Sequence, residues 1–271
     1  MSNSLDGEKR HLFYVAGGND DFKSFSDNFY AFDIKDPTKP ITLPKLPKPV
    51  SHHNLVQTQD GKTLYLIGGL YEKTKISADI YKYEIASQKW EKVAKSLPKP
   101  RANFETIVNG SRIYIFAGDS GEKMPSTQIE YFDTKTGEIV SLAERLPIGV
   151  SGASIALFNR DVLLIGGDRL GQRSTGVVML DLKDKTILSL RDLKKPRSNA
   201  IVLNTKFDEM IAIGGSGDKS VEKRHWCDKS NDYIWSDCTK DIKGLEVLGN
   251  PDEYSGVQST INISLSFDDE P

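Results

Sequence analysis

Two arginines of the chain stand in similar short motifs, Arg101-Ala102-Asn103 and Arg197-Ser198-Asn199. A guanidinium forms short, charge-assisted hydrogen bonds with carboxylates, often two at once. If the two motifs occupy equivalent loops, their arginines could together grip an acidic peptide. A second interpretation stays open at this point, in which both arginines hold loops in place by donating hydrogen bonds to backbone carbonyls.

Two further motifs resemble a metal site and a phosphate-binding loop, but the neighbouring residues that such sites require are missing. His52 and His53 are adjacent and could ligate a metal, but no further ligands stand near them at a suitable spacing, so we expect solvated loop residues. Residues 166–171 read Gly-Gly-Asp-Arg-Leu-Gly, yet a phosphate-binding loop opens a helix and this stretch ends a strand. We therefore predict no metal site and no bound cofactor.

No catalytic constellation stands out in the sequence. It contains no HExxH motif, no Gly-x-Ser-x-Gly motif and no cysteine paired by spacing with a nearby histidine. Its two cysteines, Cys227 and Cys238, are predicted to be reduced thiols. We expect a protein that is not an enzyme and has no catalytic residues.

Composition restricts the possible partners and locations. The 36 Lys and Arg residues nearly balance the 38 Asp and Glu residues, for a net charge of -2, which gives no electrostatic reason to expect nucleic-acid or membrane binding. Residues 1–10 contain no apolar core of a signal peptide, and no apolar run approaches the roughly 18 residues that span a bilayer. We expect an intracellular, cytoplasmic protein.

The elements that position these residues recur five times. An apolar strand that ends in paired small residues occurs at 12–18, 63–69, 113–118, 162–167 and 210–215. The first small residue of each pair lies at 17, 68, 117, 166 and 214, so the steps are 51, 49, 49 and 48. A period near fifty residues is typical of repeat architectures.

A second repeated feature supports the same alignment of the five copies. An acidic residue closes the third strand of each copy, at Asp33, Glu84, Asp133, Asp181 and Asp228. In the second copy, the four strands are expected at 54–58, 63–67, 80–85 and 90–93, joined by turns such as Asp60-Gly61. Each copy is therefore predicted to form one antiparallel sheet of four strands.

The first copy lacks an innermost strand, because only a short polar segment precedes Leu12. Residues 259–267 alternate apolar and polar side chains and belong to no copy. We predict that they complete the first sheet and close a ring, which removes the exposed edges of an open array. The predicted units are 12–46, 53–97, 102–147, 152–196 and 198–240, with the closing strand 259–267, in a single domain over 1–271.

These landmarks resemble the kelch repeat. The second copy shows its paired glycines, Gly68-Gly69, then an aromatic, Tyr81, then Trp90, and it ends at Leu97-Pro98. The resemblance extends over residues 12 to 267 and implies an all-β propeller. We predict five four-stranded antiparallel blades, with six as the alternative. Kelch propellers usually carry six or seven blades, so a count of five departs from the family, as do the missing tryptophan of copies one, three and four and Asp119 in place of a glycine.

In kelch propellers, ligands usually meet one mouth of the ring. That mouth is built from the loops between second and third strands and from the segments that enter each innermost strand, and loops on a rigid scaffold are in general where function lies. The resemblance thus implies a set of candidate partner-binding residues. They are His52, His53, Asn54, Tyr71, Arg101, Asn103, Asp119, Ser151, Asp168, Arg169, Arg197 and Asn199.

The predicted function is a non-catalytic interaction module, or a scaffold subunit of a larger assembly, that binds a protein or peptide. A purely structural subunit is a second possibility. The enzymatic alternative is a kelch-like propeller such as a sugar epimerase, which would need acidic and basic residues in the central cavity. A copper oxidase would need Tyr, His and Cys converging on the axis, and both cysteines lie outside the innermost strands.

Overall fold

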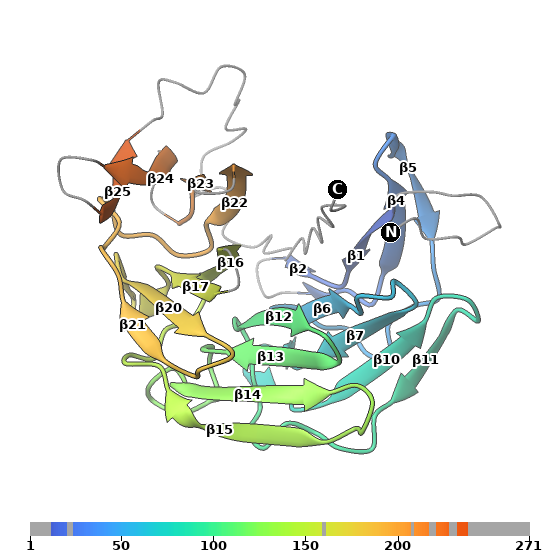
Figure 1. The fold of residues 1–271 in the computed structure, drawn as a ribbon. Helices are drawn as coiled ribbons and strands as arrows, with labels where there is room; N and C mark the ends of the chain where they lie inside the picture. The colour runs from blue at the N-terminus through green and yellow to red at the C-terminus, as the bar shows by residue number, and fades with distance from the viewer. Residues whose placement is uncertain are drawn as a thin grey trace.

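The computed structural model describes residues 12–20, 24–158, 161–206, 209–216, 221–227 and 232–237. Their secondary structure consists of strands and turns, and none of them belongs to a helix long and apolar enough to cross a membrane. The sheets are arranged around a common centre, each with one strand toward the middle and the others following outward (Figure 1). The protein is an all-β propeller, as the repeat pattern predicts.

Each sheet is antiparallel and follows chain order from the centre outward. The first contains β1 (Leu12–Ala16), β4 (Phe29–Asp33) and β5 (Asp36–Thr42). The second contains β6 (Asn54–Gln57), β7 (Thr63–Ile67), β10 (Ile80–Glu84) and β11 (Lys89–Lys92). The third contains β12 (Glu105–Asn109), β13 (Arg112–Phe116), β14 (Gln128–Asp133) and β15 (Ile139–Arg145).

The fourth sheet contains β16 (Ser154–Phe158), β17 (Asp161–Ile165), β20 (Val177–Asp181) and β21 (Ile187–Ser189). The fifth contains β22 (Ile201–Lys206), β23 (Glu209–Ile213), β24 (Val221–Cys227) and β25 (Asp232–Asp237). The predicted closing strand, 259–267, lies outside the described residues. Within them, the first sheet has three strands where each of the other four has four.

Three short two-stranded ladders were not predicted from the sequence. They are β2 (Asn19–Asp20) with β3 (Ser24–Phe25), β8 (Leu70–Glu72) with β9 (Lys75–Ile76), and β18 (Asp168–Arg169) with β19 (Gln172–Arg173). Each forms the loop that follows a glycine pair. These loops are therefore small hairpins with hydrogen bonds of their own.

The paired glycines bring consecutive sheets into backbone contact. The Gly69 N–H donates a hydrogen bond to the Arg101 carbonyl at 2.7 Å, and the Gly167 N–H donates to the Arg197 carbonyl at 2.9 Å. A Cβ on Gly68 would lie 2.3 Å from the Arg101 oxygen, and the φ of Gly68 is 60°. Only glycine fits this position without strain, because it has no Cβ to contact the Arg101 oxygen and it adopts positive φ readily.

The hydrophobic core lies between neighbouring sheets. Phe29 of the first sheet packs edge-on against Tyr83 of the second, with ring centroids 5.1 Å apart. Trp90 lies 4.8 Å from Tyr83 and 5.4 Å from Phe29, and its Nε1 donates to the Pro44 carbonyl at 3.3 Å. The tryptophan therefore fills the widening gap between outer strands, as predicted, with its polar atom hydrogen-bonded.

The acidic landmark of the repeat stabilises a turn. Asp33, Asp133 and Asp181 each accept a hydrogen bond from the backbone N–H two residues later, at 2.9, 3.0 and 2.7 Å. This is an Asx turn, in which a short carboxylate side chain imitates a backbone turn. Glu84 is one methylene longer and forms an ion pair with Lys82 instead.

Candidate functional site

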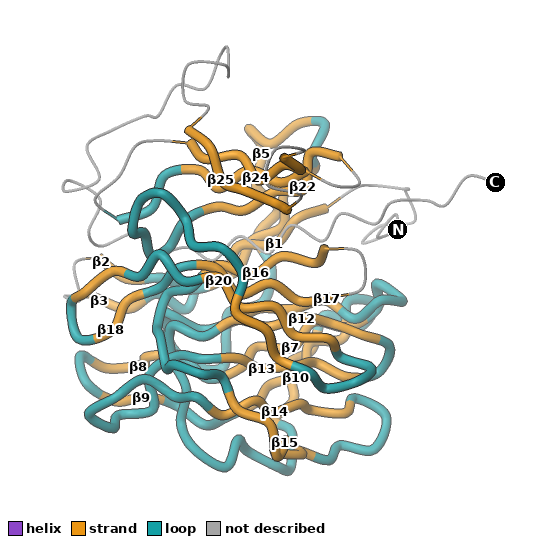
Figure 2. The backbone as a smooth tube through the Cα atoms, turned by 60° about the vertical axis from the view of Figure 1, so that its left-hand side comes forward, coloured by secondary structure: helices purple, strands orange, loops and turns teal. Residues whose placement is uncertain are grey.

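The loops that carry the predicted site gather at one end of the sheets. Figure 2 shows the short strands β2, β3, β8, β9 and β18 along one side of the molecule. Single antiparallel bridges join the segment entering an innermost strand to the loop after the small-residue pair of the same sheet, at Ser51 with Leu70, Ala102 with Asp119, and Ser151 with Asp168. We call this end of the propeller the mouth.

A run of main-chain hydrogen bonds crosses the mouth from sheet to sheet. His52, Asn103, Gly152 and Asn199 occupy equivalent positions, with φ values of 55°, 51°, 55° and 53°. The N–H of Asn103 donates to the His52 carbonyl at 3.0 Å, Gly152 to Asn103 at 2.8 Å, and Asn199 to Gly152 at 2.7 Å. Asn and Gly tolerate this left-handed conformation better than most residues. The four loops are therefore held at regular spacing by their backbones.

Four predicted residues form a polar cluster across the third and fourth sheets. The Asn103 amide donates to the Asp119 carboxylate at 3.1 Å. Burial, reinforced by the nearby charge of Asp168, raises the pKa of Asp119, while hydrogen bonds from Asn103 and Ser151 act in the opposite direction. This set of residues, Asn103, Asp119, Ser151 and Asp168, is called the mouth cluster below.

His52 belongs to a second polar group at the mouth. The Asn19 amide donates to the Ser51 hydroxyl at 2.8 Å, and that hydroxyl lies 2.8 Å from the His52 Nδ1. Ser51 is buried and lies outside the predicted set. The sequence could have identified this position, because a serine also precedes the left-handed residue in other copies, as in Ser51-His52, Ser151-Gly152 and Ser198-Asn199.

The two arginines of the predicted site lie in the interior and not at the surface of the mouth. Arg101 and Arg197 have exposed fractions of 1% and 0%. The Nη2 of Arg101 lies 2.8 Å from the Glu130 carboxylate, and the Nη2 of Arg197 lies 2.6 Å from the Glu222 carboxylate. The expectation that they grip an acidic peptide at the surface therefore has to be corrected, because their charges are neutralised inside the protein.

Both arginines hold the turn after a second strand. Arg101 Nη1 donates to the Ala117 carbonyl at 3.1 Å, and Arg197 Nη1 donates to the Gly214 carbonyl at 2.7 Å. Ala117 and Gly214 are the first small residues of their pairs, and both have positive φ. This is the second interpretation of the sequence, in which the arginines bind backbone carbonyls.

Asn54 and His53 also lie in the interior. Asn54 is buried, donates to the Phe104 carbonyl at 2.7 Å and accepts from the Thr106 hydroxyl at 2.9 Å. His53, expected to be a solvated loop residue, is 7% exposed, and burial lowers its pKa to about 4. A neutral, buried imidazole contributes to packing between the loops, so this expectation is corrected as well.

The remaining candidates lie nearer the surface. The Tyr71 ring lies 4.4 Å from the Lys48 ammonium, a cation–π contact, and Lys48 also pairs with Asp79 at 2.8 Å. Arg169 is exposed, and its Nη2 lies 3.9 Å from the Met124 sulfur. Among the described residues, no group of three or more His, Cys, Asp or Glu side chains is placed to hold a metal ion.

Comparison with known proteins places the chain in a family. Residues 7–188 and 52–246 match the family described as the KLHDC2/KLHL20/DRC7 Kelch-repeats domain. The chain belongs to the kelch-repeat family. The two matches overlap, as expected when one repeated unit fits the sequence in more than one register.

The kelch chain is similar to only part of its curated relatives. It is 24% identical over 130 residues to the Kelch-like protein terF of Aspergillus terreus, a stretch covering 46% of this chain and 28% of that protein. It is 29% identical over 121 residues to the dynein alpha chain of the flagellar outer arm of Chlamydomonas reinhardtii, covering 42% and 3%. The chain thus spans less than a third of the length of either relative.

A solved structure supports the fold. The structure titled "Structure of YjhT" matches with a TM-score of 0.65 at 18% identity, over 80% of this chain and 76% of that one. At this level of identity, the likeness concerns the architecture of the kelch propeller alone.

Proposed function

We propose that this kelch propeller is a non-catalytic interaction module, or a scaffold subunit of a larger assembly, that binds a protein partner through the loops of its mouth. The observation that carries the proposal is the mouth cluster, which brings polar side chains of two neighbouring sheets together on loops held by main-chain hydrogen bonds. Rigid placement lowers the entropy lost on binding. Membership of the kelch family agrees with a protein partner.

The chemistry of the mouth favours a partner that brings hydrogen-bond donors or positive charge. With Arg101 and Arg197 buried, the titratable groups of the mouth cluster are the carboxyls of Asp119 and Asp168, with one exposed cation, Arg169, next to Asp168 in sequence. A lysine, an arginine or backbone N–H groups of a partner would complement them. The proposed partner segment is therefore basic, where the sequence alone had suggested an acidic one.

Apolar side chains beside the mouth cluster supply anchoring area. Met124 and Leu170, in the loops after the small-residue pairs, and Ile148, before the segment that enters β16, have exposed fractions of 40%, 59% and 40%. Apolar anchors within a polar surround are the usual anatomy of an interface. We propose that these three residues contact the same partner.

The proposal includes a closed ring of five blades. The first sheet contributes three described strands, and the alternating pattern of residues 259–267 suits them to be its fourth. A completed sheet would remove an open edge, which proteins generally cover. The alternative remains six blades, and a structure that describes residues 259–267 would decide between them.

The test compares partner capture by two matched variants. The mouth variant is Asp119→Asn with Asp168→Asn, and the control is Glu91→Gln with Asp184→Asn, which removes two exposed carboxylates elsewhere. Affinity purification from the native source with mass spectrometry should recover the same partner with the unmodified chain and the control, but not with the mouth variant, at unchanged thermal stability. A partner retained by the mouth variant would place binding elsewhere.

One observation favours the enzymatic alternative as a second candidate. Burial raises the pKa of Glu105, on the innermost strand β12, to about 8. A carboxyl group that stays protonated near neutral pH is suited to general acid catalysis. Turnover of a sugar by the purified chain, abolished by Glu105→Gln, would replace the binding proposal with an epimerase. No turnover of a panel of sugars would leave Glu105 a structural residue.

A further inference from the structure

A groove lies between the third and fourth sheets, at the end of the propeller away from the mouth. β13 begins at Arg112 and runs toward the small-residue pair, and β20 ends at Asp181, so the residues that line the groove lie at the strand ends opposite that pair. The cavity measures about 400 Å³. This volume is within the range of sites that hold a ligand or an anchoring side chain.

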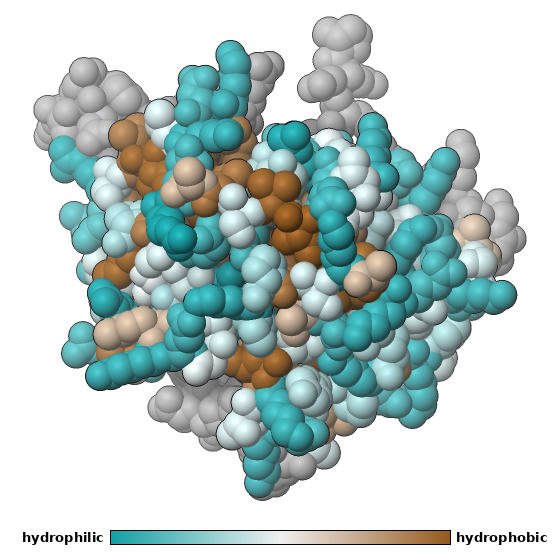
Figure 3. Space-filling model, turned by 90° about the horizontal axis from the view of Figure 1, so that it is seen from below, coloured by the Kyte–Doolittle hydropathy of each residue, from teal (hydrophilic) through white to brown (hydrophobic). Residues whose placement is uncertain are grey.

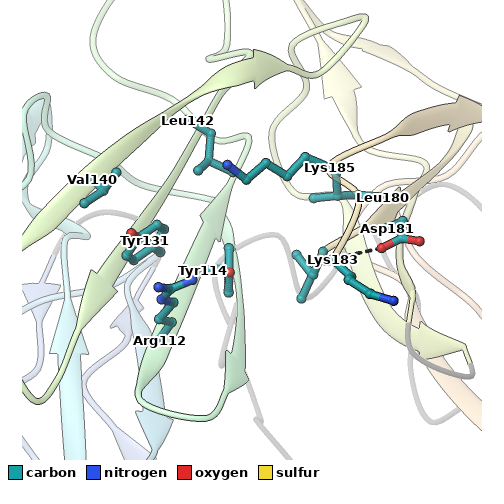
Figure 4. A pocket seen from close by; sticks show the side chains of 10 residues that line it. Arg112, Tyr114, Tyr131, Val140, Leu142, Leu180, Asp181, Lys183 and Lys185 are labelled. Carbon is teal, nitrogen blue, oxygen red and sulfur yellow. Dashed lines mark hydrogen bonds between the residues drawn. The ribbon is translucent and has the colours of Figure 1, made fainter.

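The floor of the groove is apolar. Tyr114 and Leu180 are buried, and the Tyr114 and Tyr131 rings lie 5.4 Å apart. Val140 and Leu142 of β15 add to one wall (Figure 4). The face of the molecule seen from below is mostly polar, with smaller apolar patches between the polar side chains (Figure 3). An inserted apolar side chain would find hydrophobic contact in the groove.

Positive charges surround that floor from both sheets. The Arg112 guanidinium lies 4.6 Å from the centre of the Tyr131 ring, and its side chain is half exposed. Lys183 and Lys185 come from the turn after β20, and Figure 4 shows Lys185 extended across the groove toward Leu142. Neither lysine forms an ion pair with another described residue.

The acidic residues beside the groove are already engaged. Asp181 accepts hydrogen bonds from the N–H groups of Lys183 and Asp184 at 2.7 and 2.9 Å. Asp133 accepts from the Lys135 N–H at 3.0 Å, and its Oδ2 forms a long ion pair with Arg112 Nε at 3.8 Å. Both carboxylates are held by turns and keep their charge, but the lining of the groove carries three cationic side chains, Arg112, Lys183 and Lys185, against the single carboxylate of Asp181.

We propose that the groove binds an acidic segment of a partner protein, which inserts one aromatic or branched apolar side chain between Tyr114 and Leu180. Arg112 lies on the side of the third sheet and the two lysines on the side of the fourth (Figure 4). Carboxylates on both sides of the inserted side chain would therefore each meet a cation, which suits a peptide better than a single small anion. The groove and the mouth lie at opposite ends, so the propeller can hold two partners at once.

The test selects peptides and then removes the cations. A random peptide library is panned against the full chain, and selected peptides are synthesised and their affinities measured by fluorescence anisotropy. The groove variant is Lys183→Gln with Lys185→Asn, because Lys185 has a φ of 57° and asparagine tolerates that conformation. The matched control is Lys73→Gln with Lys89→Gln, which removes one exposed charge in the turn between β8 and β9 and one on β11.

Acidic peptides with an apolar centre should be enriched. Their affinity should fall about tenfold for the groove variant, and it should fall as salt is raised from about 50 to about 500 mM because the charges are exposed. The control, and the mouth variant Asp119→Asn with Asp168→Asn, should bind as the unmodified chain does. The proposal is overturned if no such peptide is enriched, or if the peptides bind the groove variant equally well. If the groove variant shows no thermal unfolding transition and is therefore not folded, Arg112→Gln is tested in its place. It should lower the peptide affinity in the same way.

Discussion

The guanidinium of Arg101 lies 2.8 Å from the carboxylate of Glu130, and both side chains are almost wholly buried. Removing one member of such a pair leaves an uncompensated charge in the interior, at a cost of about 3–5 kcal/mol. Glu130→Gln should therefore lower the free energy of unfolding by several kcal/mol in urea denaturation. The exposed pair Lys99 with Glu122 serves as the comparison, where Glu122→Gln should leave the free energy of unfolding nearly unchanged because water screens the pair.

The Tyr83 hydroxyl has no hydrogen-bond partner among the described residues, although its side chain is fully buried. Burial raises the pKa of this phenol to about 12. Tyr83→Phe should leave stability unchanged or raise the melting temperature, because an unsatisfied buried polar atom costs about 1–3 kcal/mol. Thermal unfolding measures the change, with Tyr131→Phe as a partly exposed control. A clear loss of stability would mean that the hydroxyl is hydrogen-bonded in solution.

Glu105 should make the stability of the chain depend on pH. Its folded pKa is about 8 against an ordinary value of 4.5, so the native state binds more protons than the unfolded state between those values. Stability should therefore fall as pH rises from about 4.5 to about 8, following the linkage relation. Urea denaturation across this range measures the slope, and Glu105→Gln should flatten it. A slope that survives the substitution would assign it to other groups.

Two glycines with nearly equal φ should respond very differently to substitution. A Cβ on Gly68 would lie 2.3 Å from the Arg101 oxygen, whereas a Cβ on Gly110 would meet nothing within 4 Å. Gly110→Ala should cost about 1 kcal/mol from backbone strain alone. Gly68→Ala should cost markedly more, since the second and third sheets must separate locally. Equal losses of stability would show that the contact between sheets relaxes without cost.

The repeat, the strands and the family could be predicted from the sequence because glycine pairs and alternating apolar residues impose a local conformation. The burial of the arginines could not, because a linear pattern shows which residues are equivalent but not which way they face. The strand register shows the reason for the burial. Where the segment before an innermost strand carries an arginine, Arg101 or Arg197, the equivalent position of the third strand carries a glutamate, Glu130 or Glu222. Where that segment carries a valine, Val50 or Val150, the third strand carries Tyr81 or Val178.

The short ladders escaped prediction for a different reason. Segments such as Leu70–Glu72 and Lys75–Ile76 are only a few residues long, and too short for a periodic pattern to be recognised. The mouth cluster was partly predicted, because its four members follow from the positions of the loops. The interaction between the charges of Asp119 and Asp168 depends on how closely two sheets approach, which the sequence does not specify.

The hydrogen bonds that link His52, Asn103, Gly152 and Asn199 involve main-chain atoms only. Different side chains already occupy these positions, and the linkage tolerates all of them. If the mouth binds a partner as proposed, its side chains can change by point mutation while the main-chain frame beneath them is kept. A new binding specificity could then arise without a change of fold.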